Sequence, residues 1–298
     1  MTKKIYIIGI LLLMVNVLFA QSPATVKAYE LYTQGEYILA SEAIGQAIQE
    51  KEGLNDPLAW QLQAIIFYDI YAKIEGKNKM SESRVKALGS SLHSMELDSD
   101  KKYYDQNIMI LDRISISYYN DAVYATNNID PEIPRFAENS FKEYIRIQKI
   151  SHPGEDLSSK EIEFYKAQAT AFGNKYQLDP LNDLAYFDLT IESLNHVLQI
   201  DSNNYGANYN MAIYYYNEGF YKIDNISSVT PIIDLILIEK ESIELFKKAL
   251  PYMLKAHELK KREETFRGLR GIYRSLNDMA KFEEYELELE KFLENKSN

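Results

Sequence analysis

Apolar residues recur every three or four positions over most of this chain, which is the spacing of one face of an amphipathic α-helix. In the interval 101–127, for example, the apolar positions are Ile108, Leu111, Ile114, Tyr118 and Val123. Short segments rich in Pro, Gly, Asn and Asp separate such intervals, and these residues mark helix ends. The pattern therefore predicts an all-α fold.

The breaks divide the chain into about six pairs of helices. Asp56-Pro57 has the form of an N-cap followed by a first-turn proline, and Thr230-Pro231 has the same form. Ser158 and Glu161 have the spacing of a capping box, which predicts a helix start at Ser158. The expected pairs are 24–33 with 37–50, a helix from 57 with 81–97, 101–127 with 135–150, 158–176 with 180–200, a helix from 205 with 232–259, and a helix from 263 with 281–293.

A more specific spacing occurs between Asp201 and Tyr221. Counted from Tyr205, positions seven, eight, eleven, fifteen and seventeen are Met211, Ala212, Tyr215, Gly219 and Tyr221. These residues resemble the first helix of a tetratricopeptide repeat, a helix–turn–helix unit of about 34 residues. The resemblance implies that the small Ala212 lets a neighbouring helix approach closely. It also implies that Gly219 ends the helix in a left-handed cap.

The same register recurs along the chain. Positions twenty, twenty-four and twenty-seven of four units are Ala40, Ile44 and Ala47; Ala87, Ser91 and Ser94; Thr190, Leu194 and Val197; and Ala249, Met253 and Ala256. The resemblance is good over 24–50, 57–98, 190–221 and 249–293 and weak over 101–180, and 222–248 is an inserted segment. It implies an α-solenoid of antiparallel helix pairs, a tetratricopeptide-like superhelix that forms a single domain over 21–298.

The first 20 residues have the pattern of a secretory signal peptide. Lys3 and Lys4 precede an uncharged, largely apolar run from Ile5 to Ala20. Cleavage after Ala20 would make Gln21 the first residue and place the mature protein in the periplasm or outside the cell. An uncleaved N-terminal anchor is the alternative, although the run is shorter than the roughly 20 residues of a membrane span. We expect no transmembrane span in the mature chain.

The net charge and the amino-acid composition disfavour or exclude several classes of binding partner and functional site. The formal net charge of −11 disfavours binding to nucleic acid phosphates or anionic lipid. The chain has no cysteine, which excludes disulfides, thiolate catalysis, cysteine zinc sites and a lipid-modified N-terminal cysteine.

Candidate binding residues follow from the resemblance. In tetratricopeptide repeats, positions five, nine, twelve and thirteen usually face a concave groove that binds extended peptides. Tyrosine suits such a groove because it joins a flat apolar face to a polar tip. The alternative is that long neighbouring helices cover these side chains. The two candidate sets are Gln61, Ile65, Tyr68 and Asp69 in one repeat, and Tyr209, Ile213, Tyr216 and Asn217 in another.

Catalytic motifs are absent from the sequence, because its four histidines are scattered and no HExxH, GxSxG or phosphate-loop pattern occurs. Glu192 and His196 lie one helical turn apart and could share a metal, but no third ligand is visible, which favours a solvated pair. We expect no metal, no cofactor and no catalysis. The leading interpretation is an exported scaffold in the cell envelope that binds a protein or peptide. The alternatives are a carbohydrate-binding or cell-envelope adaptor protein, and an enzyme with an unfamiliar site.

Overall fold

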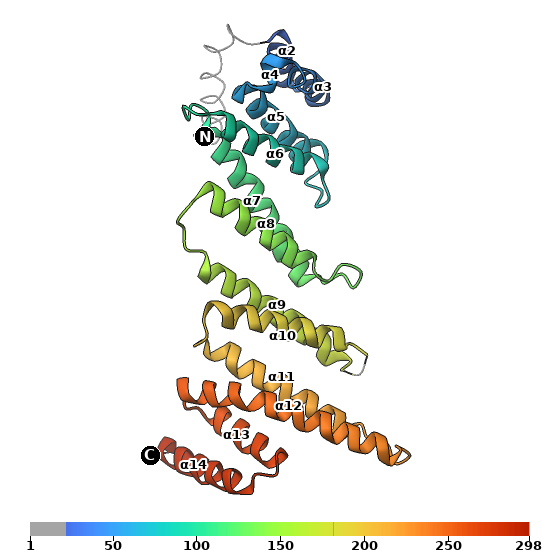
Figure 1. The fold of residues 1–298 in the computed structure, drawn as a ribbon, viewed down its shortest axis with the longest axis vertical. Helices are drawn as coiled ribbons and strands as arrows, with labels where there is room; N and C mark the ends of the chain where they lie inside the picture. Colours follow the sequence, from blue (N-terminus) through green and yellow to red (C-terminus); the bar gives the residue numbers. More distant parts are fainter. Residues whose placement is uncertain (1–21, 181, 298) are drawn as a thin grey trace. The chain divides into compact units, whose positions relative to one another are not determined.

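The computed structural model describes residues 22–180 and 182–297, and the expected signal peptide over 1–20 lies outside this part of the chain. The described residues form thirteen α-helices and no strand, as the apolar spacing predicts (Figure 1). Helices that follow one another along the chain pack in neighbouring pairs. The chain divides into two compact units, of which the first ends at Glu155 and the second begins at Asp156.

The first unit consists of three helix pairs, α2 with α3, α5 with α6 and α7 with α8 (Figure 1). Helix α3 also contacts α5, and α6 contacts α7, so each pair packs on the next. A short helix α4 and a π-helical turn η2 lie in the connections. The bounds are α2 (Pro23–Thr33), α3 (Tyr37–Ala47), α4 (Lys51–Leu54), α5 (Pro57–Asp69), η2 (Ile70–Ile74), α6 (Glu82–Leu97), α7 (Tyr104–Asn127) and α8 (Phe136–Ser151).

The expected start of α5 is confirmed. Asp56 is the N-cap, its carboxylate accepts a hydrogen bond from the Leu58 backbone N–H, and Pro57 occupies the first turn. The expected end of α3 at residue 50 is wrong, because α3 ends at Ala47 and α4 folds back against it. Gly53 in α4 permits this close return, since a Cβ there would lie 2.1 Å from the carbonyl oxygen of Ala47.

Helix α5 continues directly into η2. Ile70 and Tyr71 of η2 are buried, so the extra turn adds to the core of the first unit. The chain then reverses at Gly76 and Lys77, whose φ angles of 58° and 62° lie in the left-handed region. The expected helix over 81–97 follows as α6, with Ser81 as its N-cap.

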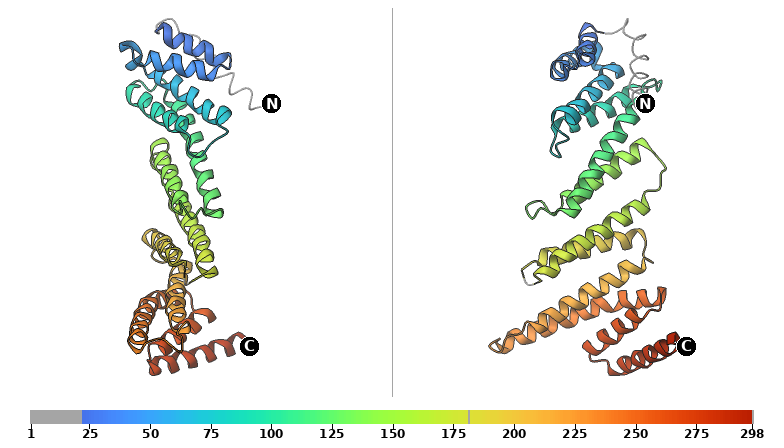
Figure 2. Two further views of the ribbon diagram at one scale, coloured as in Figure 1. Left: turned by 90° about the vertical axis from the view of Figure 1, so that its right-hand side faces the viewer. Right: turned by 180° about the vertical axis from the view of Figure 1, so that it is seen from behind.

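The second unit also consists of three helix pairs, α9 with α10, α11 with α12 and α13 with α14 (Figure 2). Contacts of α10 with α11 and of α12 with α13 join these pairs. The bounds are α9 (Ser158–Leu178), α10 (Leu184–Ile200), α11 (Tyr205–Asp224), α12 (Ile232–Leu259), α13 (Glu263–Ser275) and α14 (Met279–Ser297).

The expected helix end at Gly219 is wrong, because α11 continues through this residue to Asp224. Gly219 serves a close helix contact instead. A Cβ on Gly219 would lie 2.7 Å from Cε1 of Phe246 in α12, so any larger residue would push against a buried ring. Tyr221 therefore lies within α11, and its ring packs edge-on against Tyr176 of α9.

In the second unit, the expected helix starts at Ser158 and Ile232 are confirmed, but the expected capping residues are not, and the expected start at 180 is wrong. The N-cap of α9 is Leu157 rather than Ser158, and the Ser158 backbone N–H donates to the carboxylate of Asp156. Helix α10 begins at Leu184 rather than 180, since the Asp179 carboxylate accepts from Asn182 and closes a separate turn.

Helix α12 begins at Ile232 as expected, although its N-cap is Pro231 rather than Thr230. The Thr230 hydroxyl instead accepts a hydrogen bond from the Ser227 backbone N–H within the α11–α12 turn. Helix α12 is a single helix that contains Pro251. Ala212 is fully buried at the contact of α11 with its neighbours, and Asn277, between α13 and α14, has a positive φ of 58°.

Candidate functional site

The candidate residues on α5 lie in the first unit and differ in exposure. Gln61 is fully buried, whereas Ile65, Tyr68 and Asp69 are half-buried. Neither the amide nitrogen nor the amide oxygen of Gln61 has a hydrogen-bond partner among the described residues. A ligand on the surface of α5 would therefore reach the C-terminal end of this set, around Tyr68 and Asp69, but not Gln61.

The carboxylate of Asp69 organises that end. It accepts hydrogen bonds from Tyr32 Oη and from Lys73 Nζ, both at 2.8 Å, and Lys73 Nζ also donates to Tyr37 Oη at 2.7 Å. Burial raises the pKa of Tyr32, and the neighbouring Asp69 carboxylate raises it further. Burial lowers the pKa of Lys73, but its hydrogen bonds to Asp69 and Tyr37 outweigh burial and raise the net pKa. At neutral pH Tyr32 is therefore a neutral phenol and Lys73 an ammonium.

Tyr68 presents a different chemistry beside this cluster. Its ring lies 6.1 Å from that of Tyr71 and 5.9 Å from the Arg113 guanidinium carbon. Burial raises the pKa of Tyr68, so its hydroxyl stays protonated at neutral pH and can donate a hydrogen bond. An aromatic face, a phenol donor and an exposed cation thus stand within reach of one ligand.

The candidate residues on α11 lie in the second unit, and all four are half-buried. The ring of Tyr209 stacks on that of Tyr205 at 6.1 Å, and Tyr205 Oη donates to Glu264 of α13 at 2.9 Å. Burial and this hydrogen bond raise the pKa of Tyr205 to about 12. Burial also raises the pKa of Tyr209. This pair of stacked phenols remains neutral at physiological pH.

Neighbouring helices cover part of this second set. The ring of Tyr216 lies 5.5 Å from Phe246 of α12, and its hydroxyl lies 3.2 Å from where a Cβ on Gly271 of α13 would stand. Ile213 is partly buried against the core cluster of Ala212, Ala249, Met253, Leu269, Ile272 and Tyr273. Tyr216 therefore has a packing role whether or not it also contacts a ligand.

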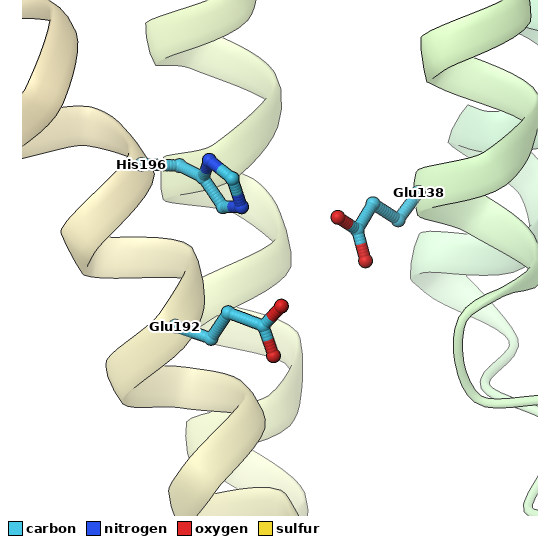
Figure 3. A group of neighbouring side chains, drawn as sticks. All are labelled: Glu138, Glu192 and His196. Atoms are coloured by element: carbon cyan, nitrogen blue, oxygen red, sulfur yellow. The ribbon is translucent and has the colours of Figure 1, made fainter.

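Glu192 and His196 project from the same side of α10, one turn apart, as their spacing predicts (Figure 3). The His196 ring stacks on Tyr165 of α9 at 4.4 Å. Among the described residues of the second unit, no further His, Asp or Glu side chain completes a group of three with them. The third residue drawn, Glu138, belongs to α8 of the first unit, where its carboxylate pairs with Arg135 and Lys142 at 3.1 Å and 2.6 Å.

The first unit also contains a pocket of about 480 Å³ that the sequence did not predict. Met80 just before α6, Val85 of α6, Tyr118 of α7 and Phe136 of α8 supply apolar walls. Arg84 lines it as well and is almost fully buried. No periodic signal marks this pocket, because its walls come from three successive helices rather than from the face of one helix.

Arg84 is held in place by its guanidinium. Nη1 donates to Asp121 at 2.6 Å, Nη2 donates to the Lys79 carbonyl oxygen at 2.5 Å, and the guanidinium carbon lies 3.9 Å from the Tyr118 ring centroid. Nε has no acceptor among the described residues. These contacts make Arg84 a fixed part of the pocket wall.

No protein-family model matches the chain, and no curated protein matches it. Of the helices over 22–180 and 182–297, none combines the length and the apolar character that a membrane crossing requires. The helix pairs, the two candidate faces and the pocket are thus the observations on which function can be argued.

Proposed function

We propose that this chain is an exported, non-enzymatic tetratricopeptide-like scaffold that binds a protein or an extended peptide in the cell envelope. One observation carries the proposal. The residues at positions twenty, twenty-four and twenty-seven of the repeat register are all at most 2% exposed in four separate helix pairs. A register chosen from sequence alone would rarely select twelve deeply buried positions, so this agreement supports a repeat architecture built on close helix contacts.

The half-buried tyrosines support a binding role for this scaffold. A tyrosine that already packs on one side loses little rotamer freedom when a ligand covers its other side. Tyr68 on α5 and Tyr209 on α11 both have this character, and each stands beside a carboxylate, Asp69 or Glu264. An extended peptide with exposed backbone groups and a basic residue suits such a surface.

A pull-down from the cell envelope of the source organism tests binding. The bait is residues 21–298, used as wild type and as the variants Tyr68→Ala and Tyr209→Ala. Tyr124→Ala is the matched control, since Tyr124 is 65% exposed and outside both candidate sets. A recovered partner should bind Tyr68→Ala or Tyr209→Ala at least tenfold more weakly than wild type, as expected for an interface anchor of about 1.4 kcal/mol or more. Tyr124→Ala should retain full affinity.

Two other outcomes would decide against this proposal. A partner that binds all three variants equally would mean that neither α5 nor α11 presents the binding face. Binding of the purified chain to a glycan array, with no protein partner recovered, would favour the carbohydrate-binding alternative.

Export is the second element of the proposal and has its own test. The intact mass of the protein isolated from native cell envelope should correspond to a chain that begins at or near Gln21. A mass that includes residues 1–20 would instead support the N-terminal anchor.

A further inference from the structure

The turn that joins α11 to α12 carries a cluster of exposed apolar side chains. In Figure 1 and in the right-hand view of Figure 2, this turn extends beyond the ends of α13 and α14 within the second unit. We call the cluster the tip patch. Its members are Phe220, Ile223, Ile226, Val229, Ile232, Ile233, Ile236 and Leu237.

The tip patch is larger than an isolated soluble chain ordinarily exposes. Val229, Ile232 and Ile233 are 84%, 73% and 69% exposed, and the other members are between 37% and 59% exposed. Together the patch leaves on the order of 800 Å² of apolar surface in solvent, whereas the largest patch on a typical monomer is about 300–600 Å². Such a surface indicates an interface.

The first two turns of α12 show the same excess of exposed apolar side chains. Leu235 and Ile238 are half-buried, whereas Ile232, Ile233, Ile236 and Leu237 are exposed. The segment is therefore apolar around most of its circumference, although only one side of it packs within the unit. A helix that is apolar all round is normally buried on all sides.

Charge argues against a lipid bilayer as the cover. Asp224 and Asp234 are exposed on either side of the turn, and a carboxylate is costly to bring into a bilayer. Over 222–241 the chain has four acidic residues against two lysines, so anionic lipid would repel this hairpin. The cover is therefore a protein surface.

The composition of the patch favours a second copy of this chain as that protein. Homodimer interfaces are more apolar than transient interfaces between different proteins, whose main anchors are Trp, Tyr and Arg. The tip patch has none of these three residue types, and seven of its eight members are aliphatic. Its area matches the roughly 800 Å² that each partner buries in an interface of standard size.

We propose that two copies of this chain form a dimer through their tip patches, related by a two-fold axis. Each copy contributes the end of α11 and the start of α12, so the interface is a four-helix arrangement with an aliphatic core. The proposal stands independently of the peptide-binding role, because the candidate residues on α5 and on α11 up to Asn217 are not in the patch.

Oligomeric state tests this inference directly. Sedimentation of residues 21–298 across the micromolar range should show a dimer for wild type and a monomer for Ile233→Glu. Ile116→Glu on α7 is the matched control, because Ile116 is 54% exposed outside the patch, and it should sediment as the wild type does. Circular dichroism should show the same helix content for all three chains.

Crosslinking provides a second test that needs no disruptive variant. Because the natural chain has no cysteine, Ile233→Cys introduces a single thiol within the patch. A short bis-maleimide should convert this variant to a covalent dimer and leave Ile116→Cys monomeric. A monomeric wild type, a dimer that survives Ile233→Glu, or equal crosslinking of both cysteine variants would overturn the proposal. Flotation with phosphatidylcholine vesicles that Ile233→Glu abolishes would assign the patch to lipid and overturn it as well.

Discussion

The two units share a plan of three helix pairs but stabilise the contacts between helices in different ways. In the first unit, many of the side chains buried between helices are polar and bond to one another. In the second unit, bulky side chains lie over glycines of the facing helix. The first arrangement specifies a contact by hydrogen-bond direction, and the second specifies it by shape.

Asn107 of α7 is the clearest example in the first unit. It is fully buried, its amide nitrogen donates to Ser94 Oγ at 2.8 Å, and its amide oxygen accepts from Ser91 Oγ at 3.2 Å. Ser94 Oγ in turn donates to the Pro57 carbonyl oxygen at 2.7 Å. This chain of bonds fixes α5, α6 and α7 in one register.

The second unit uses four glycine contacts for the same purpose. At each glycine, an added Cβ would fall within 3.2 Å of a side-chain atom from a neighbouring helix. The pairs are Gly173 with Tyr214, Gly219 with Phe246, Gly268 with Met253 and Gly271 with Tyr216. In the first unit, the glycines within described helices meet no side chain in this way. The two units should therefore respond to opposite kinds of substitution.

The largest expected effect comes from the buried ion pair of the first unit. Asp121→Ala removes the partner of Arg84, whose side chain is only 3% exposed, and should lower the free energy of unfolding by about 3–5 kcal/mol. The matched variant in the second unit, Glu244→Ala, breaks a surface pair with Lys247 and should leave the free energy of unfolding nearly unchanged, because solvent screens this pair. Trp60, the single tryptophan, lies in α5, so its fluorescence during urea unfolding reports the first unit.

A rescue variant distinguishes the loss of this ion pair from a general loss of packing. Arg84→Met combined with Asp121→Leu replaces both charges with apolar groups of similar size, and should recover most of the lost stability. If Asp121→Ala and Glu244→Ala cost the same, burial of the Arg84 pair is not what distinguishes the first unit.

Helix pairing could be predicted from the sequence because it depends on local features, namely apolar spacing, prolines and N-caps. The largest correction occurs where a distant residue decides. Gly219 has the expected position for a helix end, but Phe246, in the next helix, makes it a packing contact instead. The other corrections are local, because Asp156 accepts the Ser158 backbone N–H and Asp179 closes a separate turn before α10.

The candidate site was predictable to the extent that it lies on one helix. The tyrosines that the spacing selects on α5 and α11 are half-buried, but the burial of Gln61 depends on packing around α5 that no local pattern encodes. The Arg84 pocket gave no signal for the same reason, since Asp121 and Tyr118 reach Arg84 from another helix.

The second-largest expected effect on stability tests the glycine contacts of the second unit. Gly219→Ala should destabilise the second unit by about 1–3 kcal/mol, because the new methyl group meets the buried ring of Phe246. Gly89→Ala is the matched variant in the first unit, at an exposed position of α6 where a Cβ meets nothing within 4 Å. It should stabilise its helix by about 0.5–1 kcal/mol. Urea unfolding followed by circular dichroism measures both changes.

A double-mutant cycle gives the control. In the Phe246→Leu background, Gly219→Ala should cost much less than in wild type, because the smaller side chain leaves room for the methyl group. Strictly additive losses would mean that Gly219 and Phe246 do not limit each other, and the contrast between the units would fail at its best-defined contact.

The smallest expected effect is a loss of stability at acidic pH. His257 of the second unit is buried, its Nδ1 lies 2.9 Å from Thr265 Oγ1, and its ring packs against Phe266 and Tyr285. Burial, with a smaller contribution from Lys261, lowers the pKa of His257. By contrast, His93 and His152 of the first unit are partly exposed beside Glu96 and Asp112. Acid should therefore weaken the second unit first.

The sign of this pH dependence follows from the difference in proton binding between the folded and the unfolded chain. As the pH falls through about 6.5, the unfolded chain protonates His257 while the folded chain does not, so the free energy of unfolding decreases until the lower folded pKa is passed. His257→Gln should remove this decrease while leaving the loss at lower pH that the depressed pKa values of Asp156 and Glu264 produce. Urea unfolding at pH 7, 6 and 5 measures it, with circular dichroism for the whole chain and Trp60 fluorescence for the first unit. A wild type whose Trp60 transition shifts with pH as much as the circular dichroism transition would place the acid sensitivity in the first unit, and the contrast drawn from His257 would be wrong.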